Sequence, residues 1–369
     1  MKITCSKSDL VNGVSIVSKA VPSKTTMDIL QCILIIATNG IIKLAANDTE
    51  LGIETQINGT IEDNGIIALD AKLFNDIVRR LPNGDITIAT DSAYQTQITC
   101  MKAKFNLQGR SGEDFPYLPD VDRSDSIAIS EFSLKEIILQ TIFSISDNEN
   151  NKIMTGELFE ITGDKLRVVS LDGHRVSIRK IELRADYGFK KVIVPGKTLS
   201  DISKILTGDV EKEVSLFFMQ NHIAFEFDDT LVVSRIIEGE YFNVDQMLSD
   251  SYETKVVVNK KEFLDSIDRA TLMIKEGDKK PVVISINDDV INLKIRSVIG
   301  SMDEDIDIQK TGQDLMIGFN PKFIIDALRA ISDETITIYL ENSRAPGIIR
   351  DEEGKYVYLV LPVNFNSMM

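Results

Sequence analysis

One short run of the sequence combines residue types that can do chemistry. Asp172, His174 and Arg175 surround Gly173, so a carboxylate, an imidazole and a guanidinium lie close together along the chain. Asp and His can share a metal ion, or can act as a general acid and a general base. A metal-dependent hydrolase built on Asp172 and His174 is therefore one function that the sequence leaves open.

The rest of the sequence gives this catalytic interpretation little support. His222 is the only other histidine, and no HExxH, GxxxxGK[ST], GxGxxG or GxSxG motif occurs. The acidic run that begins at Asp303 would alternate between the two faces of a strand, which favours a solvated edge over a metal site. An Asp-Gly pair is typical of a tight turn. We therefore predict a turn at residues 172–175, and no catalytic residue, metal or cofactor.

Three stretches of the chain resemble one another at a fixed step. A lysine recurs every 125 residues, at Lys72, Lys197 and Lys322. An aspartate recurs at the same step, at Asp76, Asp201 and Asp326. Two such steps span most of a chain of 369 residues, so three tandem copies of one domain account for it.

Each copy is predicted to hold two helices among several short strands. Apolar residues at i, i+3, i+4 and i+7 predict a helix that begins near each of the repeated lysines, as in Phe74, Ile77, Val78 and Leu81. An earlier helix is expected over 10–21, 134–145 and 263–274, with Ser133 and Asn259 as N-caps of the latter two. Few helices among many strands indicate an α+β fold, with helices covering one side of antiparallel sheets.

The links between the copies also match. Gly112-Glu-Asp-Phe-Pro and Gly239-Glu-Tyr-Phe-Asn lie 127 residues apart, and each leads into an acidic stretch. We therefore place the domains at residues 1–124, 125–250 and 251–369.

Composition limits the class of protein further. The longest apolar run is far shorter than the roughly 18 residues that a membrane span needs, and the N-terminus lacks the apolar core of a signal peptide. The three cysteines, Cys5, Cys32 and Cys100, all fall in the first copy, which indicates free thiols. We expect a cytoplasmic protein without a membrane partner.

The distribution of charge matters more than its sum. The formal net charge of −16 argues against a general nucleic-acid binder. The six predicted helical segments nevertheless sum to +6, so the helices are the basic part of an acidic chain. If these helices line a hole, the hole attracts phosphate while the exterior repels it.

Several segments together resemble one family. They are Leu171-Asp-Gly-His-Arg-Val, Asn47-Asp-Thr-Glu-Leu, Phe115-Pro-Tyr-Leu-Pro and Tyr358-Leu-Val-Leu-Pro-Val. Taken with the repeat, these segments make the chain similar over nearly its full length to the bacterial sliding clamp, the β subunit of DNA polymerase III. The resemblance implies the DNA-clamp fold, a head-to-tail homodimer closed into a six-domain ring around double-stranded DNA, and no enzymatic activity. It also implies partners that bind through short linear peptides: the DNA polymerase III α subunit, the clamp loader, and other polymerases and repair proteins.

Cations on or near the helices are the candidates for contact with DNA. Phosphate contacts carry no sequence information, which suits a device that slides. The predicted residues are Lys24, Lys72, Arg79, Arg80, Lys197, Lys204, Lys322 and Arg329.

Two strands of opposite charge are the candidates for closing a dimer. One carries Lys102 and Lys104 with Phe105 and Leu107, and the other carries Asp303, Glu304 and Asp305. Edges of opposite charge can pair and bury one another. The resemblance implies that Phe105 and Leu107 pack against Leu272 and Met273 of the other subunit.

The resemblance also implies a hydrophobic groove for partner peptides. Its members would be Met154, Leu171, Gly173, His174, Arg175, Val176, Phe242, Met247, Pro346, Leu359, Leu361, Pro362 and Val363. Flexible Met and branched aliphatic side chains can repack around varied peptides, although the same residues could simply fill a core. The chain departs from many relatives at Asp28, at Asn364 and in its tail to Met369. A repeat scaffold that binds proteins without encircling DNA remains a third possible function.

Overall fold

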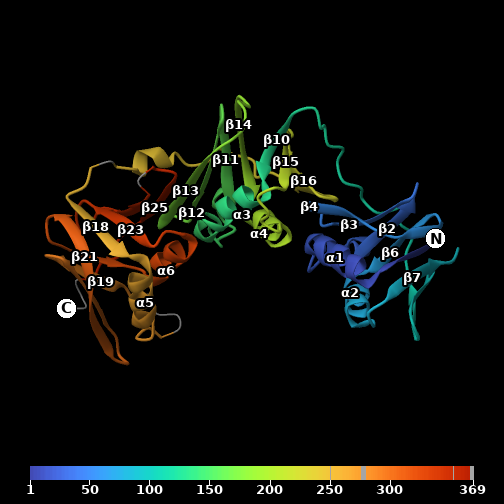
Figure 1. Cartoon of the computed structure of the whole chain (residues 1–369), viewed down its shortest axis with the longest axis horizontal. Coiled ribbons are helices and arrows are strands. Elements are labelled where there is room, and N and C mark those ends of the chain that lie inside the picture. The colour runs from blue at the N-terminus through green and yellow to red at the C-terminus, as the bar shows by residue number, and fades with distance from the viewer. Residues whose placement is uncertain (250, 276–279, 352, 366–369) are drawn as a thin grey trace. The chain divides into compact units, whose positions relative to one another are not determined.

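The computed structural model describes residues 1–249, 251–275, 280–351 and 353–365. The chain forms two compact units. Figure 1 labels the helices and strands that make them up. Unit 1 comprises Met1–Leu134 and Asp201–Ile236, and unit 2 comprises Lys135–Ser200 and Ile237–Met369. Each unit is therefore built from more than one of the three repeats.

Unit 1 contains two antiparallel sheets. The smaller sheet has the strand order β5-β1-β7-β8-β9 and the larger has the order β10-β15-β16-β17-β4-β3-β2-β6. The strands are β1 (Lys2–Ser6), β2 (Cys32–Thr38), β3 (Ile41–Asn47), β4 (Leu51–Ile57), β5 (Thr60–Asp63), β6 (Gly65–Asp70), β7 (Asp85–Thr90), β8 (Gln95–Cys100), β9 (Ala103–Gln108), β10 (Ser126–Ser130), β15 (Glu213–Phe218), β16 (His222–Phe227) and β17 (Thr230–Arg235).

Unit 2 is organised by one long run of antiparallel strands. Its order is β14-β11-β12-β13-β25-β24-β23-β18-β21-β20-β19-β22. The strands are β11 (Gly156–Thr162), β12 (Lys165–Leu171), β13 (Arg175–Glu182), β14 (Phe189–Pro195), β18 (Thr254–Asn259), β19 (Val282–Asn287), β20 (Val290–Arg296), β21 (Ser301–Gly312), β22 (Leu315–Phe319), β23 (Thr335–Leu340), β24 (Gly347–Arg350) and β25 (Tyr356–Val360).

Six α-helices are present in the described residues, two in each repeat. They are α1 (Lys7–Val17), α2 (Ala71–Arg80), α3 (Glu131–Leu139), α4 (Gly196–Ile205), α5 (Lys260–Thr271) and α6 (Pro321–Ala330). Every repeat runs strand, helix, strands, helix and strands, which confirms the prediction of two helices among several short strands. None of the helices in this part of the chain is both long and apolar enough to cross a bilayer.

Helix α2 shows why these segments become helical. Asp70 caps its first turn by accepting a hydrogen bond from the Leu73 amide at 2.7 Å. Phe74, Ile77 and Val78 are buried as the spacing predicts, because that stripe packs onto the sheet. The opposite face carries the charges of Lys72, Arg79 and Arg80 together with the exposed Leu73.

The first helix of every repeat begins three residues before the predicted start and ends earlier than predicted, since α1 is Lys7–Val17 and α5 is Lys260–Thr271 where 10–21 and 263–274 were expected. The second repeat also differs in its cap. We expected Ser133 to cap a helix over 134–145, but α3 begins at Glu131 and the cap is Ser130, whose hydroxyl accepts from the Ser133 amide at 3.1 Å. The helix ends at Leu139. A short 3₁₀ turn follows (Ile142–Ser144), and there the Thr141 hydroxyl donates to the Ile137 carbonyl at 2.7 Å. Asn259 caps α5 as predicted.

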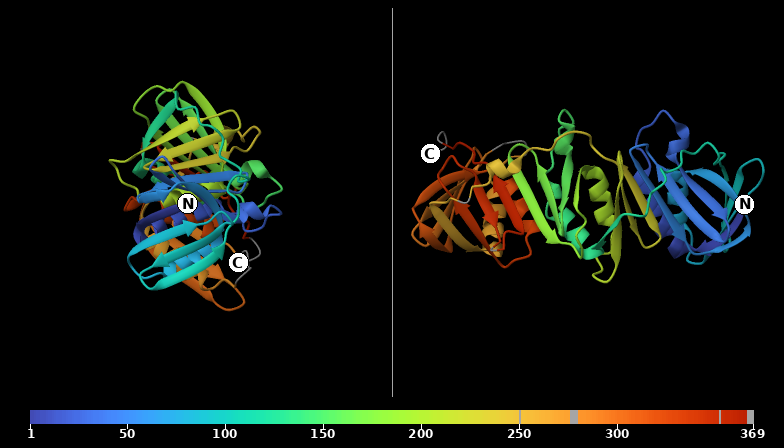
Figure 2. Two further views of the ribbon diagram at one scale, coloured as in Figure 1. Left: turned by 90° about the vertical axis from the view of Figure 1, so that its right-hand side faces the viewer. Right: turned by 90° about the horizontal axis from the view of Figure 1, so that it is seen from above.

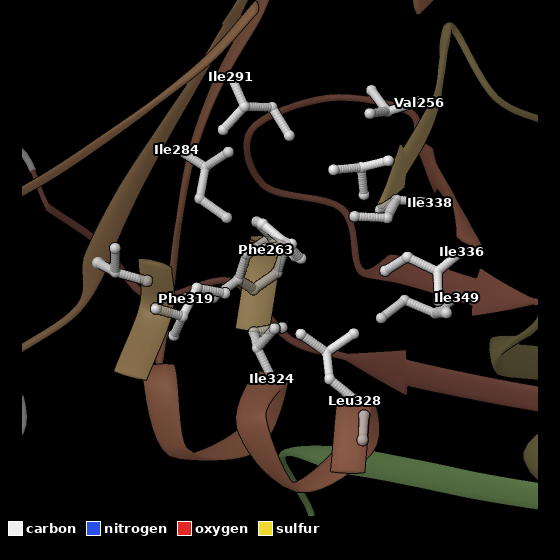
Figure 3. Packing of buried hydrophobic residues seen from close by; sticks show 14 of the residues in the cluster. Val256, Phe263, Ile284, Ile291, Phe319, Ile324, Leu328, Ile336, Ile338 and Ile349 are labelled. Carbon is white, nitrogen blue, oxygen red and sulfur yellow. The ribbon is translucent and has the colours of Figure 1, made fainter. Parts of the chain in front are cut away.

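The core of the third repeat lies between α5, α6 and the strands of unit 2 (Figure 3). Phe263 of α5 and Ile324 of α6 point into the same cluster as Ile284 of β19 and Ile338 of β23. Two further views show these helices against the strands of their repeat (Figure 2). This packing fixes which face of α6 is buried.

Candidate functional site

The run from Asp172 to Arg175 forms a tight turn between β12 and β13. One oxygen of the Asp172 carboxylate accepts from the amides of His174 and Arg175, at 2.9 and 3.1 Å. Gly173 has a φ of +86°, a conformation that favours glycine. The turn interpretation is confirmed, because Asp172 holds the backbone of His174 and not its imidazole.

Arg175 joins this turn to a helix of the next repeat. Its guanidinium, only 8% exposed, donates to the second Asp172 oxygen at 3.0 Å and to Asp326 of α6 at 2.7 Å. Burial acts against its charge, but the hydrogen bond to Asp326 and the nearby carboxylates raise the pKa of Arg175. It therefore stays charged and paired.

Aromatic rings close the remaining sides of Arg175. The guanidinium carbon lies 4.4 Å from the centre of the Phe323 ring and 5.5 Å from that of Phe143. The His174 ring stacks on Phe323 at 6.1 Å. A cation between two rings gains from both faces, so helix α6 braces the turn with a ring as well as a carboxylate.

The predicted groove residues gather in unit 2, around the pairing of β13 with β25. Leu171, Val176 and Leu359 are buried in one apolar cluster, against which Met154 packs. Val176 lies opposite Leu359 in the ladder, and the amide of Leu361 donates to the His174 carbonyl at 2.8 Å. Three apolar members stay accessible: Phe242, Met247 and Leu361 are 38%, 48% and 39% exposed. The site therefore has a buried floor and an apolar rim that water still reaches.

The other members of the set occupy the same surroundings. Gly173 and His174 are exposed, while Pro346, Pro362 and Val363 are half-buried. The Val363 amide donates to the Gly318 carbonyl at 2.8 Å, which fixes the chain just after the rim. Asn364 is exposed, and residues 366–369 of the tail lie outside the described residues.

Across the described ranges, no group of three or more His, Cys, Asp or Glu side chains could hold a metal ion. One buried acid does stand out. Glu157 on β11 is fully buried, neither of its oxygens has a hydrogen-bond partner, and burial raises its pKa well above the usual value although Thr141 opposes the shift. Its side chain therefore contributes no group to the surface.

The structure places every predicted DNA-contacting cation at the surface. Lys24 lies in the loop after α1, and the others lie on α2, α4 and α6; these are Lys72, Arg79, Arg80, Lys197, Lys204, Lys322 and Arg329. Among these cations, Lys204 lies 3.5 Å from Asp201, and Arg329 lies 3.2 Å from Asp268. Asp28 pairs with Arg110 at 3.2 Å.

The predicted interface residues lie on strand edges and at one helix end. Lys102, Lys104 and Phe105 are exposed and Leu107 is half-buried, in and beside β9. Leu272, just past α5, is 69% exposed, and Met273 packs against the third-repeat core.

The acidic strand β21 is already engaged within its own repeat. Asn292 donates to Asp303 and Asp305, at 2.6 and 2.7 Å. The Nε of Arg269 donates to Glu304 at 3.0 Å. These hydrogen bonds lower the pKa values of Asp303 and Glu304, with Asn292 and Arg269 as the respective main causes. The strand therefore presents carboxylates whose positions are fixed.

Two equivalent strand pairings join the repeats, and the sequence pattern alone did not reveal them. The last strand of the second repeat, β17, pairs with β4 of the first, and β25 pairs with β13 in the same way. We call these the first seam (β17 with β4) and the second seam (β25 with β13). The corresponding strands β9 and β21 have no such partner among the described residues: β9 pairs only with β8, and residues 301–307 of β21 pair only with β20.

The sequence pattern did not identify the residues that hold Arg175 from behind the groove. Asp326, Phe323 and Phe143 hold Arg175 but were not assigned to the site. Asp326 did stand out as part of the repeated aspartate series. The Arg175 partner could not be found from spacing, because it comes from another repeat.

Comparison with known proteins matches all three repeats of the chain to one family. Residues 1–119, 128–243 and 245–364 match the models for the N-terminal, central and C-terminal domains of the DNA polymerase III beta subunit. A beta sliding clamp of Staphylococcus aureus is 32% identical over 98% of this chain and 99% of its own length.

Two solved structures are similar over their full length. A putative DNA polymerase III beta subunit from Eubacterium rectale is 63% identical, with a TM-score of 0.95 over 99% of this chain and 100% of that one. The DNA polymerase sliding clamp of Bacillus subtilis is 33% identical, with a TM-score of 0.95 over 99% of both chains.

Proposed function

The chain belongs to the family of the bacterial DNA polymerase III β subunit, and from this premise we propose that two copies close head to tail into a ring around duplex DNA. The family consists of sliding clamps, which are non-catalytic processivity factors of DNA replication. The chain is accordingly three tandem clamp domains of helices and antiparallel sheets. We place the domain boundaries near residues 124 and 250.

The observation that carries the ring is the pair of strand edges left open by the repeat. Each repeat has a last strand (β9, β17 or β25) and a strand with which the last strand of another repeat can pair (β4, β13 or β21). Inside the chain, β17 pairs with β4 and β25 pairs with β13, so β9 and β21 are the strands that remain. A third seam between β9 of one copy and β21 of another would bury both edges. Because β9 and β21 belong to opposite ends of the chain, two such contacts close a dimer without fibres.

Equivalence with the two existing seams supplies a register for the third. Gly52 pairs with Val233 in the first seam, and Val176 pairs with Leu359 in the second. The residues at corresponding positions beside the hairpins are Asn106 and Ser301, so we place these two opposite one another. Lys104 then faces Asp303, and Lys102 extends toward Asp305. The charges are complementary in this register, which favours the correct partner.

Duplex DNA fits the charge distribution of the helices. The exposed cations come from one helix of each repeat and from one loop, whereas the chain as a whole carries −16. A ring that presents these helices inward would hold DNA through phosphates alone, so it would bind weakly, sensitively to salt and without sequence preference.

The groove at the second seam is the proposed dock for partner peptides. It offers a buried aliphatic floor, an accessible rim of Phe242, Met247 and Leu361, and a polar turn at His174. We propose that the polymerase α subunit, the clamp loader, and other polymerases and repair proteins insert short apolar peptides there. The protein acts in the cytoplasm, where its DNA is, and its three cysteines are free.

Cysteine cross-linking tests the ring and its register together. Asn106→Cys combined with Ser301→Cys should give a covalent dimer on mild oxidation, because opposed residues in a ladder are close enough for a disulfide. The matched control is Asn106→Cys with Met302→Cys, which a one-residue offset directs to the other face. The native cysteines are buried and should stay unreactive. A monomer from the first variant, or an equal yield from the control, would reject this seam.

A further inference from the structure

At the first seam, Leu118 occupies the space that a side chain at position 52 would need, because residue 52 is glycine. A Cβ atom added to Gly52 of β4 would lie 1.8 Å from the Cδ2 atom of Leu118, far inside any tolerated contact. Only glycine at position 52 therefore lets Leu118 reach the sheet here. Leu118 packs with Val121 and Met219 against a cluster that contains Val233, the ladder partner of Gly52.

The segment around Leu118 is fastened at both ends. The Asn47 side-chain amide donates to the Pro116 carbonyl at 3.2 Å. Beyond the segment, Arg123 donates from Nε and Nη2 to the Glu226 carboxylate, at 3.1 and 2.9 Å. Residues 116–121 are thus held against β4 and β17, with Leu118 as the apolar anchor.

The position of Leu118 corresponds to the floor of the partner groove. The turn from Asn47 to Leu51 is the counterpart of the turn from Leu171 to Arg175. Gly52 and Val233 are the counterparts of Val176 and Leu359, which form the groove floor at the second seam.

The second linker behaves differently at the same point. The matching links lie 127 residues apart, so Asp245 is the counterpart of Leu118. Asp245 turns to Arg167, with carboxylate oxygens 2.5 and 3.1 Å from its guanidinium. Asp245 therefore places no apolar side chain on Val176 and Leu359, whereas its counterpart Leu118 does so at the first seam. Other residues of the second linker, Tyr241 and Val244, are buried in the cluster that holds Val176 and Leu359 and form part of the groove.

We propose that residues 116–121 are an intramolecular peptide ligand, docked through Leu118 in the first-seam counterpart of the partner groove. The site takes an extended peptide with one leucine anchor, and the chain supplies that peptide itself. Resting on the proposed function, this leaves one open groove at the two seams inside each chain.

A peptide added in trans tests this directly. The variant replaces residues 116–121 of the full-length chain by glycine and serine, and the probe is a fluorescein-labelled peptide of residues 113–123. By anisotropy, the variant should bind the probe at one site per chain. The wild-type chain should bind it at least about tenfold more weakly, because a tethered ligand competes at roughly millimolar effective concentration. A probe with Leu118→Ala should lose at least about tenfold in affinity.

A second variant distinguishes binding at the first-seam site from binding in the partner groove. Adding Leu361→Ala to the variant should leave probe binding unchanged, so failure of the partner groove would not imitate failure here. The proposal is overturned if the folded variant does not bind the probe at about 1 mM. It is equally overturned if Leu361→Ala removes the binding, because the probe would then lie in the open groove.

Independent support comes from filling the glycine. Gly52→Val, which installs the residue type of the second seam, should expel Leu118 and speed chymotryptic cleavage beside the exposed Tyr117 by at least about tenfold. An unchanged cleavage rate would show that Leu118 does not depend on this space, and would contradict the docking.

Discussion

Arg175 Nη1 and Asp326 Oδ2 lie 2.7 Å apart, and this contact ties the turn of the partner groove to helix α6. The same helix carries Lys322 and Arg329 on its exposed side. One helix therefore holds this turn from its buried side and presents two cations at the surface on the other, where we propose that they face DNA.

Asp326→Asn should destabilise the protein and weaken the groove together. Breaking a buried ion pair leaves an uncompensated charge, but Asp172 remains as a partner, so we expect a loss of about 2 kcal/mol in the free energy of unfolding. The matched control is Asp201→Asn, its repeat equivalent on α4, whose ion pair with the exposed Lys204 should matter by less than about 1 kcal/mol. Urea unfolding and peptide titration measure both effects; equal losses in the two variants would contradict the account.

Leu361→Ala should remove most of the affinity for a polymerase C-terminal peptide. Leu361 is 39% exposed at the rim, so its loss costs little stability, whereas an anchor contact contributes at least about tenfold to binding. Leu171→Ala should weaken binding too, but with a stability loss of about 2 kcal/mol because that side chain is buried. Calorimetric titration and thermal melts separate the two. Unchanged affinity in Leu361→Ala would count against the groove.

Replacing Lys72, Lys197 and Lys322 together by alanine should lower the salt dependence of DNA binding. Each lysine that neutralises a phosphate contributes about 0.9 to the slope of log K against log salt. A double replacement of the exposed strand lysines Lys165 and Lys180 is the control and should leave the slope unchanged. If both variants shift the slope equally, the repeated lysines are ordinary surface charges.

Glu157→Gln should change how stability depends on pH. In the folded protein, Glu157 keeps its proton at pH values where the unfolded chain, whose glutamate pKa is about 4.3, has already released it. Wild-type stability from this group is therefore lost as pH rises from about 4.3 toward the folded pKa, by up to about 1.4 kcal/mol per pH unit. Glutamine does not titrate, so the free energy of unfolding of the variant should rise relative to that of the wild type between pH 5 and 7 in urea titrations. A constant difference would show that Glu157 is ionised in the fold.

The sequence period was enough to predict three copies, their two helices and the buried stripe of α2. The starts of α1, α3 and α5 were each missed by three residues, because the predictions began at the first apolar residue of the stripe and the first turn lies before it. The relation between Arg175 and Asp326 was out of reach for a different reason. It depends on which strand of one repeat pairs with which strand of the next, and a pattern within one repeat does not contain that information. The space beside Gly52 likewise depends on the pairing of β4 with β17, a strand of another repeat.

Retention on DNA of different topology tests the central claim most directly. The clamp should be loaded onto nicked circular DNA with a cognate clamp loader and ATP, and then separated from free protein by gel filtration. We predict that it stays with the closed circle and leaves once a restriction enzyme linearises it, because only threading holds it. Equal retention on circular and linear DNA, or none on either, would contradict an encircling ring; no retention on either is the result that a pure protein scaffold would give.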